Sequence, residues 1–540
     1  MMNNNTNNSI PNPFHDLFEE IKKRDNMYQR DLSFEMMVYS SFKKGLPSKI
    51  GNEDWLVQLS DEDKLMLSST NTDIDLSIST MSEGANLNDR TIVFDDQTGL
   101  NAFNIKNSFF ISQHTNIGTQ YSRITIARAA EIINRNYDGE KPQKFRAIIL
   151  YNDKIQKIIF HYIFAHFIAD KSQRMCIGIV TDRSLLILNG VSFSYHNIRF
   201  LVYIYSREVN SSSSYLVVEA LDPVKYDEYI NASNKILCAI GFFSTIYPFG
   251  PYMVFDVSSE QSVFVAYKSC YDKPRTAKYT MLTLNPYAYY SDKDIRDYVF
   301  KGVGNGEVNQ EAILGVEKEL RPVERKHFEK LLGLLDDKRF SDIFYNLQEI
   351  STTTLGGNFS SHSISLISYA VCLESVANWF HKSINIKKKA KNTLLSDDIR
   401  NTIKQEFLAV LDQYKDIEQE DMTKIRNKIT SSLFCKPNAD NLSEPFEFFG
   451  VELREEDREL LNMRNKILHG EDVLESNLDL DNIVPYLLKA EQYCFGFHSL
   501  IWRLIMKAIG YDGVYRDEAK MIENQTTDQS NNGKPNIKRI

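Results

Sequence analysis

Arg464, Asn465 and His469 are the residues of this 540-residue chain whose types and spacing best suit a chemical reaction. They lie in the stretch MRNKILHG, where Asn465 and His469 are four residues apart and so share one face of a helix. An imidazole can move a proton near neutral pH, and a guanidinium can bind a phosphate through two hydrogen bonds and stabilise charge that develops on it. Because no cluster of carboxylates accompanies the group, it predicts metal-independent cleavage of RNA with the neighbouring 2′-hydroxyl as nucleophile.

The residues around this group predict a helix over 454–469 that ends at the histidine. Three acidic residues lie in its first turn and basic residues in its last, which is the charge order that a helix dipole favours. Gly470 follows at once, as a helix-terminating residue does. We therefore expect the His469 side chain to leave the helix at its last turn. On the local pattern alone, a histidine that serves only to compensate the helix dipole is the more frequent explanation.

A second copy of the letters RNKI begins at Arg426, 38 residues earlier, without a histidine after it. Met422, Ile425, Ile429 and Leu433 place one apolar stripe along this helix. We interpret Arg426 as part of a solvated helix edge, which makes it an internal control for Arg464.

The rest of the chain predicts a multidomain α+β protein in which a β-rich N-terminal domain precedes an all-α helical bundle. Short segments rich in Ile, Val, Phe and Tyr dominate from about residue 55 to 290 and predict strands, with helices expected at 123–136 and 226–245. Apolar residues at three- and four-residue spacing then predict helices at 323–336, 340–350, 363–382, 397–415, 419–434, 454–469 and 482–509. The last of these is apolar on most sides, which is typical of a helix that is central to a bundle or lies in a subunit interface. The expected boundaries are a disordered leader (1–20), the β-rich domain (21–305), a linker (306–322), the helical domain (323–512) and a disordered tail (513–540).

The helical part resembles the HEPN superfamily, and its Apea-like branch in bacterial anti-phage and abortive-infection proteins is the nearest match. The resemblance rests on SYAVCLESVANWF, a long helical insert, MRNKILHG and a closing apolar helix, over roughly residues 320–510. The family motif of Arg, usually Asn, and then His matches Arg464, Asn465 and His469. Glu374 matches an acidic position that these domains often carry on an earlier helix. Glu471 departs from one toxin subgroup, which has a tyrosine two residues after the histidine.

The resemblance implies an endoribonuclease that acts in anti-phage defence by abortive infection, with tRNA as a candidate substrate. It implies a homodimer or higher homo-oligomer formed through the HEPN domain, in which both motifs line one cleft. His469 would be the general acid and base, Arg464 the phosphate and transition-state stabiliser, and Asn465 a supporting hydrogen-bonding group. Glu374 would orient Arg464 or His469, and no cofactor is expected. The alternative is a non-catalytic HEPN-like module that binds nucleic acid or nucleotide, or only dimerises, and does not depend on His469.

The N-terminal half carries no catalytic motif, and we expect it to sense an infection signal, with a phage-derived trigger as a further partner, or to position substrate. A basic stretch after the Glu374 helix contains Lys387, Lys388, Lys389 and Lys391. It could hold RNA phosphates by non-specific attraction, and the alternative is a solvated loop.

The composition predicts a cytoplasmic protein. The net charge of −9 argues against coating of nucleic acid over the whole surface, and the six cysteines form no CxxC pair, which favours buried thiols in a reducing compartment. The uncharged segment 236–255 contains Pro248, Gly250 and Pro251, so it predicts a buried helix, a turn and a strand rather than a membrane span. His381 and His498 are single histidines on apolar helices, where packing is the expected role.

Overall fold

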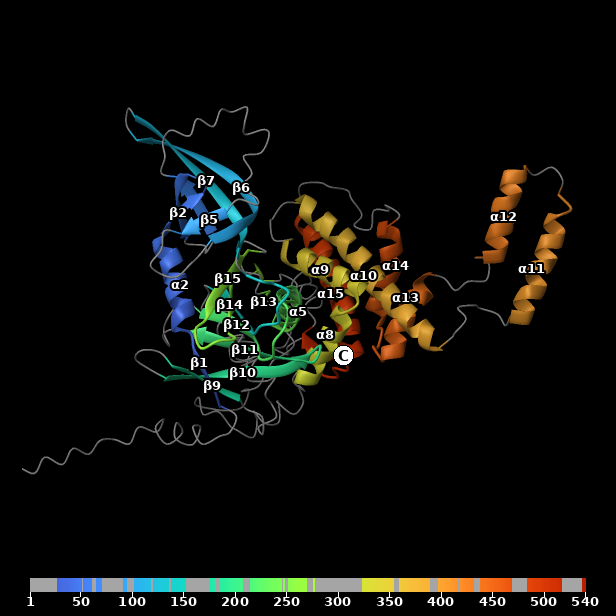
Figure 1. The fold of residues 1–540 in the computed structure, drawn as a ribbon. Helices are drawn as coiled ribbons and strands as arrows, with labels where there is room; N and C mark the ends of the chain where they lie inside the picture. The colour runs from blue at the N-terminus through green and yellow to red at the C-terminus, as the bar shows by residue number, and fades with distance from the viewer. Residues whose placement is uncertain are drawn as a thin grey trace, which may run out of the picture. The chain divides into compact units, whose positions relative to one another are not determined.

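The computed structural model (Figure 1) describes residues 27–50, 52–60, 65–69, 91–94, 102–117, 120–135, 137–151, 175–180, 185–206, 214–244, 246–247, 251–269, 275–276, 323–353, 359–388, 397–414, 418–431, 438–468, 483–516 and 537–540. These residues form two compact units. The first runs to residue 276 and also takes up residues 323–333, and the second begins at residue 334. The helical domain was expected to start at residue 323, whereas most of its first helix, α8 (Arg325–Leu335), groups with the β-rich unit.

The β-rich unit contains a 14-stranded sheet in the order β1-β9-β10-β11-β12-β8-β14-β15-β7-β4-β3-β2-β5-β6. Only the pairing of β1 with β9 is parallel among the described pairs of this sheet. The strands are β1 (Met27–Asp31), β2 (Leu46–Ile50), β3 (Glu53–Leu59), β4 (Leu65–Ser69), β5 (Thr91–Phe94), β6 (Ala102–Ile117), β7 (Gln120–Asn134), β8 (Phe145–Tyr151), β9 (Met175–Val180), β10 (Leu185–Tyr195), β11 (Ile198–Ser206), β12 (Ser214–Ala220), β14 (Tyr252–Asp256) and β15 (Val263–Lys268). Short strands β13 (Ile246–Tyr247) and β16 (Arg275–Thr276) form a separate pair. The prediction of a β-rich N-terminal half followed by helices is confirmed.

Strand β7 closes part of this sheet into a ring. One edge of β7 pairs with β6 along its length, while the other edge is divided between β4, at residues 125–128, and β15, at residues 131–133. Strands β7, β4, β3, β2, β5 and β6 therefore form a closed circuit of hydrogen-bonded neighbours. The remaining eight strands extend from β7 as an open sheet.

The helix expected at residues 123–136 is wrong, because residues 123–134 belong to strand β7. Its sequence, RITIARAAEIINRN, combines alanines that favour a helix with four isoleucines that favour a strand. Pairing on both edges decides between the two, since a strand between neighbours satisfies all its backbone groups.

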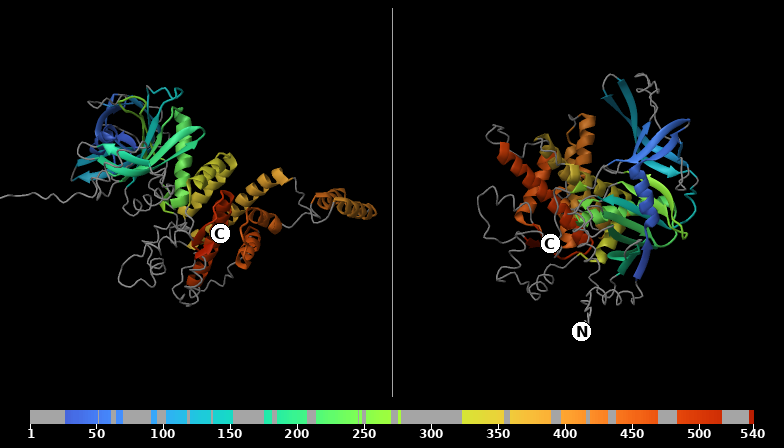
Figure 2. Two further views of the ribbon diagram at one scale, coloured as in Figure 1. Left: turned by 90° about the horizontal axis from the view of Figure 1, so that it is seen from below. Right: turned by 90° about the vertical axis from the view of Figure 1, so that its left-hand side faces the viewer.

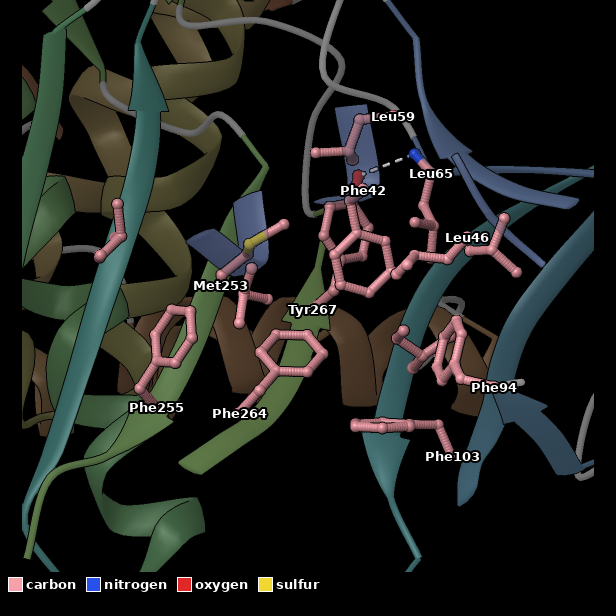
Figure 3. Close-up of a cluster of buried hydrophobic side chains, with 14 of the residues drawn as sticks. Phe42, Leu46, Leu59, Leu65, Phe94, Phe103, Met253, Phe255, Phe264 and Tyr267 are labelled. Atoms are coloured by element: carbon pink, nitrogen blue, oxygen red, sulfur yellow. Dashed lines mark hydrogen bonds between the residues drawn. The ribbon is translucent and has the colours of Figure 1, made fainter. Parts of the chain in front are cut away.

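Helix α2 (Ser33–Lys44), which was not predicted, packs on one face of the sheet. In Figure 2 the strands curve around this blue helix. Phe42 is fully buried, with its ring 5.7 Å from that of Phe94 in the closed ring and 5.6 Å from that of Phe264 in the open sheet. Figure 3 shows this apolar cluster, in which the backbone N–H of Leu65 donates a hydrogen bond to the Tyr267 hydroxyl at 3.1 Å. The helix thus joins the ring and the open sheet into one core.

Helix α5 (Tyr226–Ser244) covers the opposite face of the open sheet, as the alternation along β8 requires. Phe145 of β8 points to α5, with its ring 5.1 Å from that of Tyr229, whereas Ile148 belongs to the cluster beneath α2. The Tyr229 hydroxyl donates to the Val218 carbonyl oxygen at 2.7 Å, which fixes the helix to β12. The helix predicted at residues 226–245 is confirmed, as is the strand that follows it.

None of the helices in the described part of the chain combines the length and apolar character needed to cross a membrane. Cys238, Cys372 and Cys494 are buried free thiols, as the sequence predicted for its cysteines. Burial raises the pKa of Cys372 to about 12.

The helical unit consists of α9 (Lys338–Thr353), α10 (Phe359–Lys388), α11 (Asp397–Leu411), α12 (Gln419–Ser431), α13 (Asn438–Phe449), α14 (Glu455–Leu468) and α15 (Ile483–Ala508). Helix α10 packs against α9, α13, α14 and α15, while α11 and α12 pack against each other. The predicted helices are confirmed, and α15 is buried along most of its length, as expected. Helix α13 was not predicted, because Pro445 lies inside it and proline normally ends a helix.

The expected disordered tail is wrong in part. Strand β17 (Val514–Arg516) pairs antiparallel with β18 (Ile537–Arg539), close to the end of the chain. Tyr515 of β17 is 1% exposed, and its ring lies 6.5 Å from that of Trp502 in α15. Aromatic packing against α15 therefore orders part of a segment whose polar sequence predicted disorder.

Candidate functional site

The structure brings three of the predicted site residues together where α14 crosses α10. The Arg464 guanidinium, on α14, forms an ion pair through Nη2 with the Glu374 carboxylate on α10. Its Nη1 donates a hydrogen bond to the Asn465 side-chain oxygen. Arg464 is only 4% exposed, whereas about a third of the Glu374 side chain is exposed. Asn378, one turn further along α10, donates through Nδ2 to Glu374 Oε1 at 3.5 Å.

The remaining predicted residues lie at the edge of what the structure describes or beyond it. Helix α14 ends at Leu468, so His469 and Gly470 fall outside the described residues. Lys387 and Lys388 form the end of α10, where a loop had been the alternative, and only their backbone is described. Lys389 and Lys391 lie outside the described residues.

A buried ion pair fixes the start of α14 and so the direction of the whole helix. Asp457 Oδ2 accepts a hydrogen bond from the backbone N–H of Arg454 at 3.0 Å, as a capping carboxylate does. Asp457 Oδ1 accepts another from Arg503 Nη2, on α15, at 2.6 Å. The Arg503 guanidinium also lies 5.4 Å from the Tyr515 ring centre. Only the acidic third position of the helix hinted at this arrangement in the sequence.

One nitrogen of Arg464 makes no hydrogen bond to the described residues. Its Nε is buried and has no hydrogen-bond partner among the residues that the structure describes. The other two nitrogens bind Glu374 and Asn465. A guanidinium held in this way keeps its orientation, and among the described residues its Nε–H group is not used in a hydrogen bond.

An exposed apolar strip on α10 leads to this group. Ile364, Ile367 and Val371 are 63%, 47% and 46% exposed, and their spacing of three and four residues places them on one helix face. Glu374 follows three residues later on the same face. Exposed apolar side chains gathered on one face are typical of a contact surface.

Arg426, in the other copy of RNKI, has different surroundings. Its Nη2 forms an ion pair with Asp412, and both side chains are about half exposed. Since exposed pairs of this kind contribute little to stability and no histidine belongs to this one, Arg426 remains a suitable control for Arg464.

His381 and His498 are packed, as predicted. His381 Nδ1 lies 3.0 Å from Glu444 Oε2, between α10 and α13. His498, on α15, is buried with its ring 5.7 Å from that of Tyr369 in an edge-to-face contact. Burial lowers the pKa of His498 to about 3.

This depressed pKa predicts a loss of stability in acid. Below pH 6.5 His498 is protonated in the unfolded chain but stays neutral in the folded chain. The free energy of unfolding should therefore fall by about 1.4 kcal/mol for each unit by which the pH decreases. Urea titrations between pH 7 and pH 5 measure this slope. The variant His498→Gln, whose side chain does not titrate, should lose that part of it, and equal slopes in both proteins would contradict the assignment.

No protein-family model, curated protein or solved structure matches the chain. What the site can do therefore rests on its own chemistry. Helix α14 carries a buried, oriented guanidinium whose Nε has no hydrogen-bond partner among the described residues, and the residue after this helix is His469. An exposed apolar face of α10 lies beside Glu374.

Proposed function

We propose that the chain is a metal-independent endoribonuclease of the HEPN type. The observation that carries the proposal is the Arg464 group, in which Glu374 and Asn465 hold the guanidinium and leave its Nε–H unbonded among the described residues. These contacts fix the orientation of the guanidinium, which supports a role in stabilising charge on a phosphate. His469, the residue after the end of α14, supplies the group that titrates near neutrality.

The reaction consists of one displacement at phosphorus. A base removes the proton of the 2′-hydroxyl, O2′ bonds to the adjacent phosphorus, and the bond from phosphorus to O5′ breaks. O5′ leaves with a proton from an acid, so the products are a 2′,3′-cyclic phosphate and a 5′-hydroxyl. His469 serves as base or acid, and Arg464 stabilises the negative charge on the non-bridging oxygens. Asn465 and Glu374 keep Arg464 in place.

Homodimerisation through the helical unit is part of the proposal. The exposed strip of Ile364, Ile367 and Val371 supports it, because a second copy would bury these side chains. Since the strip ends next to Glu374, such pairing would bring two Arg464 groups near each other and provide both an acid and a base.

A second candidate function is a non-catalytic module that binds nucleic acid or nucleotide, or only dimerises. The 4% exposure of Arg464 favours it, because a guanidinium already bound at two nitrogens also fits a purely structural ion pair. In that case the packing of α14 against α10 would depend on Arg464, and His469 would have no role.

The biological setting follows from the family resemblance: a cytoplasmic anti-phage protein that stops infection by cutting RNA, with tRNA as a candidate target. The β-rich unit would then respond to a phage-derived trigger or position substrate.

Cleavage of an RNA oligonucleotide in EDTA tests the proposed reaction. We expect products that end in a 2′,3′-cyclic phosphate or its 3′-phosphate, identified by mass spectrometry. An oligonucleotide of the same sequence with 2′-deoxy sugars should remain intact, because it lacks the nucleophile. Cleavage of the deoxy substrate at a similar rate, or a 5′-phosphate on the product, would exclude this mechanism.

A further inference from the structure

Three charged side chains meet beneath α2, on the face of the sheet that this helix covers. Glu35 comes from α2, Arg146 from β8 and Glu219 from β12, where Glu219 and Arg146 are paired in register. Arg146 Nη1 forms an ion pair with Glu35 Oε1, and Arg146 Nε donates to Glu219 Oε2 at 3.1 Å. Ser262 Oγ donates to Glu35 Oε1 at 3.2 Å. We call Glu35, Arg146 and Glu219 the buried triad.

The buried triad carries an excess negative charge when both carboxyl groups are ionised. Its members are at most 5% exposed. Among the described residues, the phenol of Tyr203 on β11 also interacts electrostatically with Arg146, and that of Tyr229 on α5 acts on Arg146 and Glu219 from the opposite face of the sheet. Phenols are neutral at physiological pH, so one guanidinium opposes two carboxylates. Burial of an uncompensated charge is unfavourable, and a proton on one carboxyl group removes it.

Glu35 is the carboxyl group that can take this proton. Its Oε2 is buried and has no hydrogen-bond partner among the described residues, whereas its Oε1 binds Arg146 and Ser262. Burial raises the pKa of Glu35, and this effect outweighs the opposing contacts with Arg146 and Ser262. The pKa of Glu35 is therefore higher when α2 is docked than when Glu35 is exposed to water. Docking of α2 is strongest at low pH and weakens as the pH rises through the pKa that Glu35 has in the docked state.

We infer that α2 is a proton-dependent plug, which docks firmly when Glu35 is protonated and loosens when Glu35 ionises. Loosening would uncover the aromatic side chains that contact Phe42 in the docked state, among them Phe94 and Phe264 (Figure 3). The N-terminal unit thus contains a device that converts a change in pH or in local charge into exposure of an apolar surface. This inference stands apart from the ribonuclease activity.

Hydrogen exchange of the full-length protein, followed by mass spectrometry from pH 5 to pH 8, tests the plug. Protection factors, which remove the intrinsic pH dependence of exchange, should fall for α2 by up to about tenfold per pH unit while Glu35 loses its proton. Those of α5, on the opposite face, should stay constant. In Glu35→Gln, which is always neutral, the α2 protection should be independent of pH.

Two further variants make the test decisive. Glu219→Gln neutralises the second carboxyl group of the buried triad, so that one carboxylate faces one guanidinium. The amides of α2 should then stay protected from hydrogen exchange at pH 8. Asp222→Asn, in the exposed pair of Arg199 and Asp222, is the matched control and should keep the wild-type slope. Circular dichroism confirms that each variant is folded. An unchanged slope in Glu35→Gln, or parallel loss of protection in α2 and α5, would overturn the inference.

Discussion

Replacing His469 with alanine is expected to lower the rate of RNA cleavage by about 100- to 10,000-fold, which is the usual contribution of a general acid or base. The reason is that Arg464, Asn465 and Glu374 supply charge and orientation, whereas the imidazole of His469 is the side chain type suited to proton transfer near neutral pH. Single-turnover cleavage of an RNA oligonucleotide measures the effect, and a melting curve shows whether the variant is folded.

The chain offers a control for each weakness of this experiment. Arg426→Ala alters the other copy of RNKI and should leave cleavage within about twofold of wild type, because an exposed ion pair contributes little to the fold. Arg464→Ala is a less specific probe, since it removes a buried guanidinium and affects stability as well as activity. Wild-type cleavage by His469→Ala would remove the histidine from the mechanism. Absence of cleavage in every form would favour the binding module.

Replacing Arg503 with alanine is expected to reduce the free energy of unfolding by about 3–5 kcal/mol, because it leaves the Asp457 carboxylate buried without its partner. The two side chains are 2% and 11% exposed, so the Asp457 carboxylate is largely shielded from bulk water. The variant also loses the stacking of the guanidinium on Tyr515. Urea denaturation followed by circular dichroism measures the change, and the start of α14 should show the earliest loss of structure in hydrogen exchange.

Arg199→Ala is the matched control for this variant, because Arg199 pairs with Asp222 at the same 2.6 Å separation but with 59% of its side chain exposed. It should cost less than about 1 kcal/mol. Asp457→Asn with Arg503→Met removes both charges and should recover part of the loss. A change below about 1 kcal/mol in Arg503→Ala would mean that the buried pair does not support α14.

Much of the fold could be predicted from the sequence, because periodicity reports which face of an element is buried. The two halves and the central position of α15 follow from it. The errors occurred where pairing or packing decides the structure. The segment 123–136 has alanines that favour a helix, yet its residues up to Asn134 belong to β7, because strands pair with both edges of β7. Pro445 lies inside α13, and the polar tail becomes ordered through Tyr515.

In the candidate site, too, some contacts could be predicted from the sequence and others could not. Arg464 and Asn465 are adjacent in the chain, so their proximity was certain, and the helix that carries them was predicted from its charges. Glu374 was selected as a group that could orient Arg464, and the structure places its carboxylate on that guanidinium. Asp457 and Arg503 were not found, because an acidic first turn does not reveal which distant arginine it meets.

The shared core beneath α2 has a consequence for synthesis of the protein on the ribosome. Phe42 leaves the ribosome early, yet its partner Phe264 belongs to the last long strand of the sheet. Translation of the roughly 220 residues between them takes about 10–45 s at about 5–20 residues per second. Throughout this time the apolar face of α2 has no complete surface to cover it. We therefore expect the early segments of the nascent chain to depend on chaperones more than the helical unit does.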